Sequence, residues 1–375
     1  MGTEPVLVLH DGEAAFERVE AWLREQGFFA PGGEQLVADV YLGYGLSQSI
    51  RRSSGAGPPE PCALPLAACA VRPVVHDVKH DNEGDAAIGD WRRTWAVDDH
   101  AGAVREVRAA IGRGDVYQVN LVQHLSASFA GSPRSLAARL RSLTQPNGAP
   151  FADDGWRLFD GVEWAIVSAS PELFLARRGR RLWTRPIKGT RPRGGRAELL
   201  DSAKDAAEHV MIVDLERNDL SRVCEPGTVQ WPELMQAETL AGVEHLVSTV
   251  EGKLRDDVGL AEILAATFPG GSVTGAPKIA AVDLIAALEP VGRGASMGAL
   301  GRIYGNGDFE LALTIRTFAI AEGLIHLWVG GGVVWDSDPY EEVAESLVKA
   351  APLLEAIDAP LERPRTVGVG AAARS

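Results

Sequence analysis

The spacing of apolar runs near the carboxyl terminus is the feature that most constrains the fold. Residues 296–304, 309–320 and 324–334 form three such runs, separated only by Gly-Asn-Gly-Asp and Ala-Glu-Gly. Consecutive strands joined by turns this short must be antiparallel, because a parallel pair needs a crossover of about a dozen residues or more. Residues 173–176 and 181–184 flank Arg-Arg-Gly-Arg and predict one more hairpin.

Helical patterns lie between and after these strands. Apolar residues recur at helical spacing in 202–217, 277–288 and 339–351, and the last helix is predicted to end before Pro352. Hairpin strands covered by helices make an α+β architecture, and a Rossmann sheet is not indicated. Residues 51–70 are rich in Pro, Gly and Ser and predict a loop. A chain of 375 residues, 46% of them hydrophobic, can bury the core of one large domain or two ordinary ones.

Charge and cysteine content narrow the class of protein. The 51 acidic and 37 basic side chains give a formal net charge of -14, which argues against nucleic-acid binding and favours a small ligand. Cys62, Cys69 and Cys224 are too few, and odd in number, for a disulfide framework, so a reducing compartment fits best. There is no basic-then-apolar leader and no run of roughly 20 apolar residues. We therefore expect a cytoplasmic protein that does not bind membranes.

Two predicted helices each carry a pair of acids on one face. Asp205 and Glu208 are spaced i, i+3 in the first helix. Glu342 and Glu345 repeat that spacing in the second, and Lys349 continues their stripe. Acids in a first helical turn can simply complement the helix dipole and face water. If the four carboxylates converge, they would repel one another unless a hard cation such as Mg²⁺ lay between them.

Lys188 is the candidate nucleophile. It follows a predicted strand and lies between an apolar isoleucine and a Gly-Thr turn. A lone lysine is most often a solvated surface residue. A lysine at a strand end inside a pocket can instead have its pKa lowered by desolvation, which makes the amine nucleophilic.

Arg316 is predicted in the middle of a strand over 311–320, on the same side as Thr314. A charge in that position must be paired or face a pocket, so a structural salt bridge and a ligand contact stay equally open. The glycine-rich segments 269–278 and 330–332 each let backbone N–H groups approach an anion closely.

His245 and Glu172 stand in apolar or turn contexts. Taken singly, each would more often be a structural residue than a catalytic one.

Taken together, these segments resemble the chorismate-utilising family, which includes anthranilate synthase component I, aminodeoxychorismate synthase component I, isochorismate synthase and salicylate synthase. The resemblance runs from about residue 102 to 356. It rests on GDVYQVNL (114–121), SPELF (170–174), RPIKGTRPRG (185–194), AEHVMIVDLERNDLSRVCEPGTV (207–229), EHLVSTVEG (244–252), GGSVTGAPK (270–278), the strand holding Arg316, and GGGVVWDSDPYEEVAESLVKA (330–350).

The resemblance implies two large antiparallel β-sheets packed together, with helices on the outside and an active site between the sheets. It implies a divergent amino-terminal region at 1–100, integrated with the core, and a chorismate-binding catalytic domain at 101–356. Residues 357–375 are expected to form a loose tail.

The resemblance also implies roles for individual residues and a magnesium cofactor. Metal ligands are expected at Glu208 and Glu345, with Asp205 and Glu342 beside them. His245 is expected near the substrate ring, and Glu172 as the acid/base. The positions expected to bind the substrate are Thr190, Ser272, Arg316, Gly330, Gly332 and Lys349.

Two positions distinguish the reactions of the family. Isochorismate and salicylate synthases carry a water-activating lysine where this chain has Gln118, so water addition is disfavoured. Anthranilate synthases usually have alanine where this chain has Lys188, whereas lysine is typical of aminodeoxychorismate synthases. The implied reaction is attack of Lys188 on carbon 2 of chorismate with loss of the 4-hydroxyl, followed by ammonia at carbon 4.

Two alternatives within the family are an anthranilate synthase component I and an amino-deoxyisochorismate synthase. A catalytically silent, regulatory homologue is a third.

The chain has no candidate for a glutamine-hydrolysing domain, since Cys62 and Cys69 lack a glycine-rich nucleophile elbow and Cys224 lies within a matched motif. The resemblance therefore implies a separate glutamine amidotransferase subunit as the source of ammonia.

Overall fold

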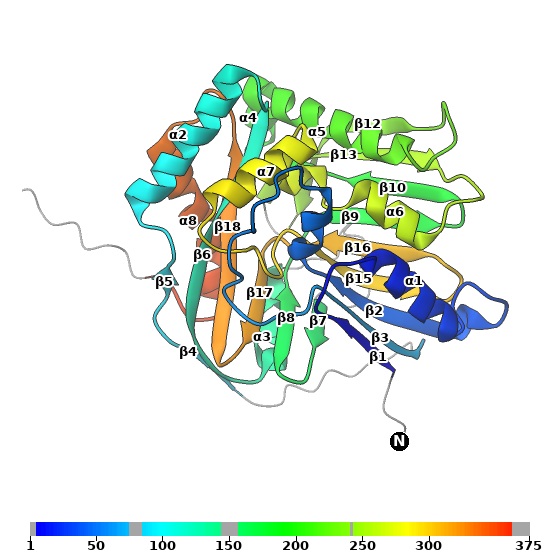
Figure 1. The fold of residues 1–375 in the computed structure, drawn as a ribbon. Helices are drawn as coiled ribbons and strands as arrows, with labels where there is room; N and C mark the ends of the chain where they lie inside the picture. The colour runs from blue at the N-terminus through cyan, green and yellow to red at the C-terminus, as the bar shows by residue number, and fades with distance from the viewer. Residues whose placement is uncertain (1–4, 75–84, 144–156, 241–242, 362–375) are drawn as a thin grey trace, which may run out of the picture.

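The computed structural model describes residues 5–74, 85–143, 157–240 and 243–361. Over these residues the strands form two antiparallel sheets, one of ten strands and one of eight. Figure 1 shows the two sets of strands, with helices on the outside. The predicted α+β fold with two large antiparallel sheets is confirmed, as is the hairpin over 173–185.

The larger sheet has the strand order β1 (Val6–Leu9), β3 (Ala67–Pro73), β2 (Leu36–Leu42), β15 (Ala299–Tyr304), β16 (Phe309–Leu313), β9 (Leu173–Arg178), β10 (Arg181–Arg185), β13 (Val243–Lys253) and β11 (Ile187–Pro192), with β12 (Gln230–Leu240) paired to β13. The smaller sheet has the order β14 (Gly275–Ala276), β6 (Gln118–Gly131), β18 (Leu324–Val333), β17 (Thr317–Ala321), β8 (Trp164–Ser168) and β7 (Arg157–Asp160), with β4 (Ala86–Ile88) and β5 (Arg92–Arg93) paired to β6. The described helices are α1 (Ala15–Glu25), α2 (Val97–Arg113), α3 (Pro133–Arg139), α4 (Arg196–Asp201), α5 (Ala203–Ser221), α6 (Leu260–Thr267), α7 (Lys278–Leu288) and α8 (Pro339–Ala356).

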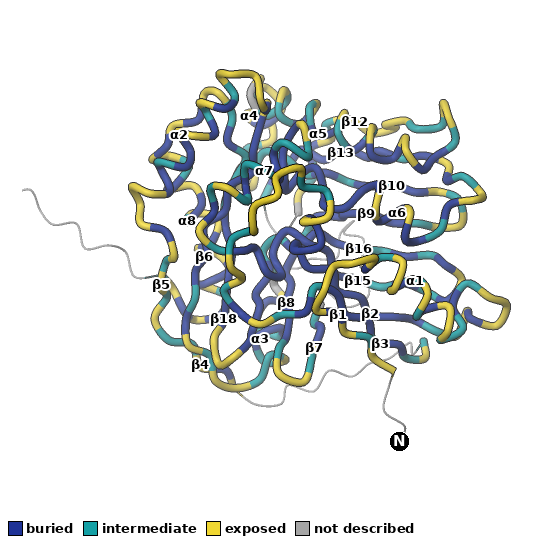
Figure 2. The backbone as a smooth tube through the Cα atoms, in the orientation of Figure 1, coloured by how far each residue is buried: buried dark blue, intermediate teal, exposed yellow. Residues whose placement is uncertain are grey.

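The hydrophobic core lies between the sheets. One continuous cluster of buried side chains contains Val40 and Leu300 of the larger sheet together with Leu121 and Trp328 of the smaller one. A second cluster covers the outer face of the smaller sheet, where α3 and α8 pack on Phe318. Figure 2 shows buried backbone along the central strands and exposed residues at the turns. Burial of this apolar surface is the main stabilising contribution to the fold.

The apolar run 309–320 is two strands rather than the single strand predicted. β16 pairs in the larger sheet and β17 in the smaller one. The break between them contains Arg316, whose φ of 49° lies in the left-handed region that a strand cannot continue through. The prediction that Arg316 lies in mid-strand, on the side of Thr314, is therefore wrong.

A second crossing runs beside the first. Residues 169–172 carry the chain from β8 in the smaller sheet to β9 in the larger one. Two backbone hydrogen bonds join the crossings: Ala169 N–H donates to Arg316 O at 3.0 Å, and Leu313 N–H donates to Glu172 O at 3.1 Å. Glu172 and Arg316 consequently sit together where one sheet passes into the other.

The helix predicted to end before Pro352 continues through it as α8. Buried Leu353 and Leu354 extend its apolar face beyond the proline. Val348, whose carbonyl loses its usual partner at position 352, lies on the exposed side, so water can hydrogen-bond there. Packing of the last turn therefore offsets the missing backbone hydrogen bond.

Residues before position 100 contribute strands to the larger sheet, because β2 pairs with β15 along its length. The loop predicted over 51–70 ends earlier than expected, since β3 begins at Ala67. Residues 362–375, most of the predicted tail, lie outside the described residues. None of the described helices combines the length and apolar character that a bilayer crossing requires.

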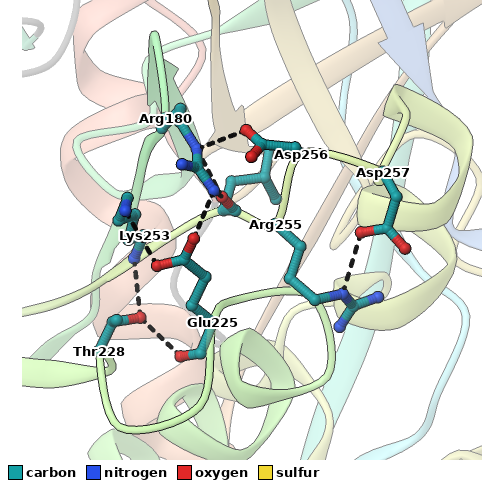
Figure 3. Close-up of polar contacts among 8 residues, drawn as sticks. Arg180, Glu225, Thr228, Lys253, Arg255, Asp256 and Asp257 are labelled. Carbon is teal, nitrogen blue, oxygen red and sulfur yellow. Dashed lines mark hydrogen bonds and ion pairs between the residues drawn. The ribbon is translucent and has the colours of Figure 1, made fainter.

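Helix α5 is held at both ends. Ser202 Oγ accepts a hydrogen bond from Asp205 N–H at 3.2 Å and so caps the amino end of the helix. Beyond the carboxyl end, Glu225 pairs with Arg180 at 2.6 Å and Lys253 at 3.0 Å, which ties the helix to the β9–β10 turn and the end of β13 (Figure 3). Hydrogen bonds from Lys253 and Arg180 lower the pKa of Glu225.

A buried ion pair connects α7 to the smaller sheet. Glu289 accepts from Arg293 at 2.7 Å and from Val122 N–H at 3.0 Å, while Arg293 also donates to Asn120 O and Val273 O. Both charged side chains are at most 2% exposed. Each charge therefore depends on the other for compensation inside the protein.

Replacing Glu289 with alanine should lower the free energy of unfolding by about 3 to 5 kcal/mol, because the Arg293 charge would stay buried without a carboxylate. The matched control is Asp115→Ala, which breaks an exposed pair with Arg113 and should cost about 1 kcal/mol or less. Urea unfolding of the three proteins measures both effects. Equal losses in the two variants would contradict this account.

Candidate functional site

Lys188 follows strand β10, as predicted, and is the second residue of strand β11. The strand pairs with β13 at Lys188 and Leu246, and its register shifts between Lys188 and Arg191. Gly189 in that shift has a φ of 62°, and a Cβ there would lie 2.6 Å from Leu199 Cδ1. Only glycine fits this conformation and contact without strain, so the glycine fixes how the lysine strand bends over α5.

The Lys188 amine is close to two oxygen atoms. Its Nζ donates to Ser272 O at 3.1 Å and lies 3.8 Å from Glu208 Oε1. The lysine side chain is 11% exposed. Glu208 Oε1 also accepts from Gln118 Nε2 at 2.7 Å, so this carboxylate is shared by an amide and an ammonium group. A positive charge at Lys188 also disfavours protonation of buried His209, whose pKa is lowered to about 4, mainly by burial.

Glu172 is the buried acid on the second crossing. Burial raises its pKa, while Lys188 and a hydrogen bond from Ser272 act in the opposite direction. Ile187 N–H donates to its Oε1 at 3.4 Å. A carboxyl group with a raised pKa beside a lysine is suited to give and take a proton.

Arg316 lies near the same acid, and His245 lies near Arg316. Burial lowers the pKa of Arg316, and the charge of Glu172 raises it. His245 Nδ1–H donates to Gly189 O at 2.9 Å, which fixes the ring on the β11 bend. Burial lowers the pKa of His245 as well. The charge of Arg316 also disfavours protonation of the His245 ring.

The glycines of β18 leave room for groups from two helices. A Cβ on Gly332 would collide with the Gln118 amide and lie 3.0 Å from Glu208 Oε1. A Cβ on Gly331 would lie 2.9 Å from Lys349 Nζ, 3.5 Å from Glu342 Oε2 and 3.8 Å from Glu345 Oε1. Glu208 of α5 thus lies near Gly332, and Glu342 and Glu345 of α8 lie near the adjacent Gly331.

The α8 stripe follows the predicted spacing. Lys349 Nζ donates to Gly330 O at 3.2 Å and pairs with Glu345 at 2.8 Å. Glu342 accepts from Ser337 Oγ at 2.6 Å. Asp205 on α5 pairs with Arg191 at 2.9 Å.

Carboxylate oxygens are the ligands that Mg²⁺ prefers, and α5 and α8 each bring a carboxylate near the glycines of β18. Within the described ranges, no three His, Cys, Asp or Glu side chains already form a metal cluster. Magnesium commonly takes only one or two protein carboxylates and completes its shell with water and substrate oxygens. Glu208 and Glu345 fit that description better than Asp205, which is engaged by Arg191.

The structure brings most of the predicted residues into one region. Ser272 contacts Lys188, and Glu172 contacts Ser272. The side chain of Thr190 lies outside the described part of the structure. One buried acid near the site, Glu216 on α5, was not predicted from the sequence. The one sequence feature that indicates it is its position eight residues after Glu208, which places it near the same face of the helix.

The comparisons with known proteins agree with this arrangement. The family model for chorismate binding enzymes matches residues 12–355. Component 1 of aminodeoxychorismate synthase from Klebsiella aerogenes is 40% identical over 276 residues, 72% of this chain and 60% of that protein. An anthranilate synthase component 1 from Haloarcula marismortui is also 40% identical, over 80% of this chain and 61% of that protein.

A solved structure shares the fold. Anthranilate synthase component I from Streptococcus pneumoniae matches with a TM-score of 0.75 and 28% identity, over 84% of this chain and 80% of that one. The chain spans about three fifths of the length of the two curated relatives above. Because the family model covers nearly all of the described fold and the site, the chain belongs to the chorismate-binding enzyme family.

Proposed function

We propose that the chain is the chorismate-converting component of an aminodeoxychorismate synthase, which makes 4-amino-4-deoxychorismate from chorismate and ammonia. The observation that carries the proposal is the position of Lys188: a nearly buried amine within reach of Ser272 O and beside Glu172. An anthranilate synthase adds ammonia to carbon 2 directly and needs no amine nucleophile in that place.

In the proposed first step, Lys188 Nζ forms a bond to carbon 2 of chorismate. The two ring double bonds shift, the bond from carbon 4 to its hydroxyl breaks, and Glu172 gives the proton with which the hydroxyl leaves as water. Ammonia then bonds to carbon 4, the double bonds shift back, and the bond from carbon 2 to Nζ breaks. The new ammonium group at carbon 4 gives a proton back to Glu172, which restores the acid. Lys188 leaves as the free amine.

The neighbouring charges set the requirements for this chemistry. An ammonium group cannot attack carbon 2, and the Glu208 carboxylate lies 3.8 Å from Lys188 Nζ. Mg²⁺ held by Glu208 and Glu345 would neutralise those carboxylates and bind a carboxylate of the substrate.

We propose that the substrate carboxylates are held by Arg316, Lys349, Ser272 and the backbone of Gly330 and Gly332. His245 is proposed to lie near the substrate ring. Asp205 and Glu342 are proposed as outer metal ligands.

Gln118 supports ammonia over water as the incoming group. Its Nε2 donates to Glu208, and a neutral amide has no basic nitrogen with which to deprotonate water. Addition of water to chorismate therefore lacks a base at this position.

The cysteines support an external source of ammonia. All three are free and buried, and burial raises the pKa of Cys62 to about 12 and of Cys224 to about 11. A glutamine-hydrolysing thiol must be an accessible thiolate, which these are not. We propose a separate glutamine amidotransferase subunit, a cytoplasmic location, and a product used for para-aminobenzoate and folate or related compounds.

The runner-up is an anthranilate synthase component I, because relatives with both names are equally similar to this chain. The product of the purified chain decides between them.

Chorismate, Mg²⁺ and ammonium incubated with the purified chain should yield 4-amino-4-deoxychorismate, identified by mass and absorbance. Glutamine in place of ammonium should give no product, because no reactive thiol is present to release ammonia. Anthranilate as the main product would establish the runner-up, and turnover with glutamine alone would contradict the proposed partner.

Lys188→Ala should lower kcat for this product at least about 100-fold, because covalent catalysis is lost. The dissociation constant of chorismate should change less than about threefold, since other groups bind its carboxylates. Lys253→Ala, which removes an exposed lysine, is the matched control. Without ammonium, chorismate should add to the wild-type peptide that contains Lys188. Wild-type product formation by Lys188→Ala would show that the lysine is not the nucleophile.

Chelation should abolish turnover, and added Mg²⁺ should restore it. Glu345→Gln should raise the Mg²⁺ concentration for half-maximal activity at least about tenfold, equivalent to ~1.4 kcal/mol of binding. Glu355→Gln, at an exposed position ten residues further along α8, should leave that concentration unchanged. Full activity after exhaustive chelation would rule out the magnesium requirement.

A further inference from the structure

Glu216 is a buried acid that the proposed reaction does not use. It lies on α5, eight residues beyond Glu208, and its residue is 4% exposed. Gly271 N–H donates to its Oε1 at 3.1 Å, and the backbone of Ser272 also donates to it. The carboxyl group therefore accepts the first N–H groups of the short 3-10 helix Gly271–Val273, which have no partner within that helix.

The contact between α5 and this turn leaves no free space. A Cβ on Gly271 would lie 2.6 Å from Leu215 Cδ2 and 3.1 Å from Glu216 Oε1. A glycine in this place lets the helix approach the backbone closely enough for the carboxyl group to reach the N–H groups.

Ser272 connects Glu216 to the two reacting groups. Its N–H donates to Glu216, its carbonyl accepts from Lys188 Nζ at 3.1 Å, and its side chain hydrogen-bonds Glu172. The position of one residue thus sets where both the amine and the acid lie. A shift of this turn would move the partners of both groups together.

The far end of the same segment has its own anchor. Lys278 Nζ pairs with Asp219 at 2.5 Å and donates to Thr267 O at 2.9 Å. Asp219 lies three residues after Glu216 on α5, so one helix holds the segment at two points. Loss of the Glu216 contact should therefore release the turn at Ser272 locally while Lys278 keeps the rest in place.

We propose that Glu216 is a positioning residue that holds the Gly271–Ser272 turn where Ser272 can reach both Lys188 and Glu172. The inference rests on the proposed function, because it assumes that those two groups react with chorismate. Glu216 itself touches neither group's reacting atom in this account. It acts by hydrogen-bond acceptance at the turn, and a neutral acceptor of the same shape should substitute for it.

A comparison of Glu216→Ala with Glu216→Gln distinguishes two roles of the side chain. The alanine removes the hydrogen-bond acceptor, whereas the glutamine removes only the ionisable group. Glu216→Ala should lower kcat about tenfold. KM for chorismate should rise by a smaller factor, because Ser272 moves with the turn while Arg316 and Lys349 stay in place. Glu216→Gln should keep kcat within about threefold of wild type, since its amide oxygen still accepts from the turn. Asp214→Ala, on the exposed side of the same helix, is the matched control and should leave kcat unchanged.

A second route to the same displacement keeps Glu216 intact. Gly271→Ala should push the turn from α5 through the contact with Leu215 and lower kcat by a similar factor. Gly271→Ala therefore tests the positioning role of the turn even if Glu216→Ala does not fold. An unchanged kcat in the variant that displaces the turn, or equal losses in Glu216→Ala and Glu216→Gln, would overturn the inference. Absence of chorismate turnover by the wild-type chain would instead count against the proposed function.

Discussion

The double crossing between the sheets is the constraint on which the rest of the structure depends. The chain passes from the smaller to the larger sheet at 169–172 and back at 314–316, and two backbone hydrogen bonds join these passages. A junction of this kind interrupts both ladders and leaves polar backbone in the interior, which is stable only when every group finds a partner. The interruption is also what places Glu172 and Arg316 in the interior between the sheets, where ordinary strand positions would hold apolar side chains.

Burial of these charges governs the chemistry of the site. An isolated charge in the interior is costly, so each charged group described above lies near an opposite charge or a hydrogen-bond partner. Lys188 donates to the carbonyl of Ser272 and lies beside Glu208, which accepts from the amide of Gln118. Glu172 lies beside the same lysine. These contacts keep an amine and a carboxyl group close together, which is the arrangement that covalent and acid–base catalysis require.

Membership of the chorismate-binding enzymes follows from the whole fold, whereas the specific reaction depends on very few side chains. Relatives named as aminodeoxychorismate and anthranilate synthases are equally similar to this chain. The proposed distinction rests on Lys188 in a strand whose backbone conformation is set by Gly189. Small changes in such a strand can alter the chemistry without altering the packing that defines the family.

The antiparallel architecture can be predicted from the amino-acid sequence, since turns as short as the one between β17 and β18 allow no other pairing. The acidic faces of α5 and α8 can be predicted as well, because helical spacing fixes which residues share a side. Three features become visible only in the folded chain: the run 309–320 divides between two sheets, α8 continues through Pro352, and Glu216 reaches the turn at Ser272. These outcomes depend on contacts between residues far apart in the chain, where packing and hydrogen-bond partners outweigh local propensity, and no periodicity along the sequence records them.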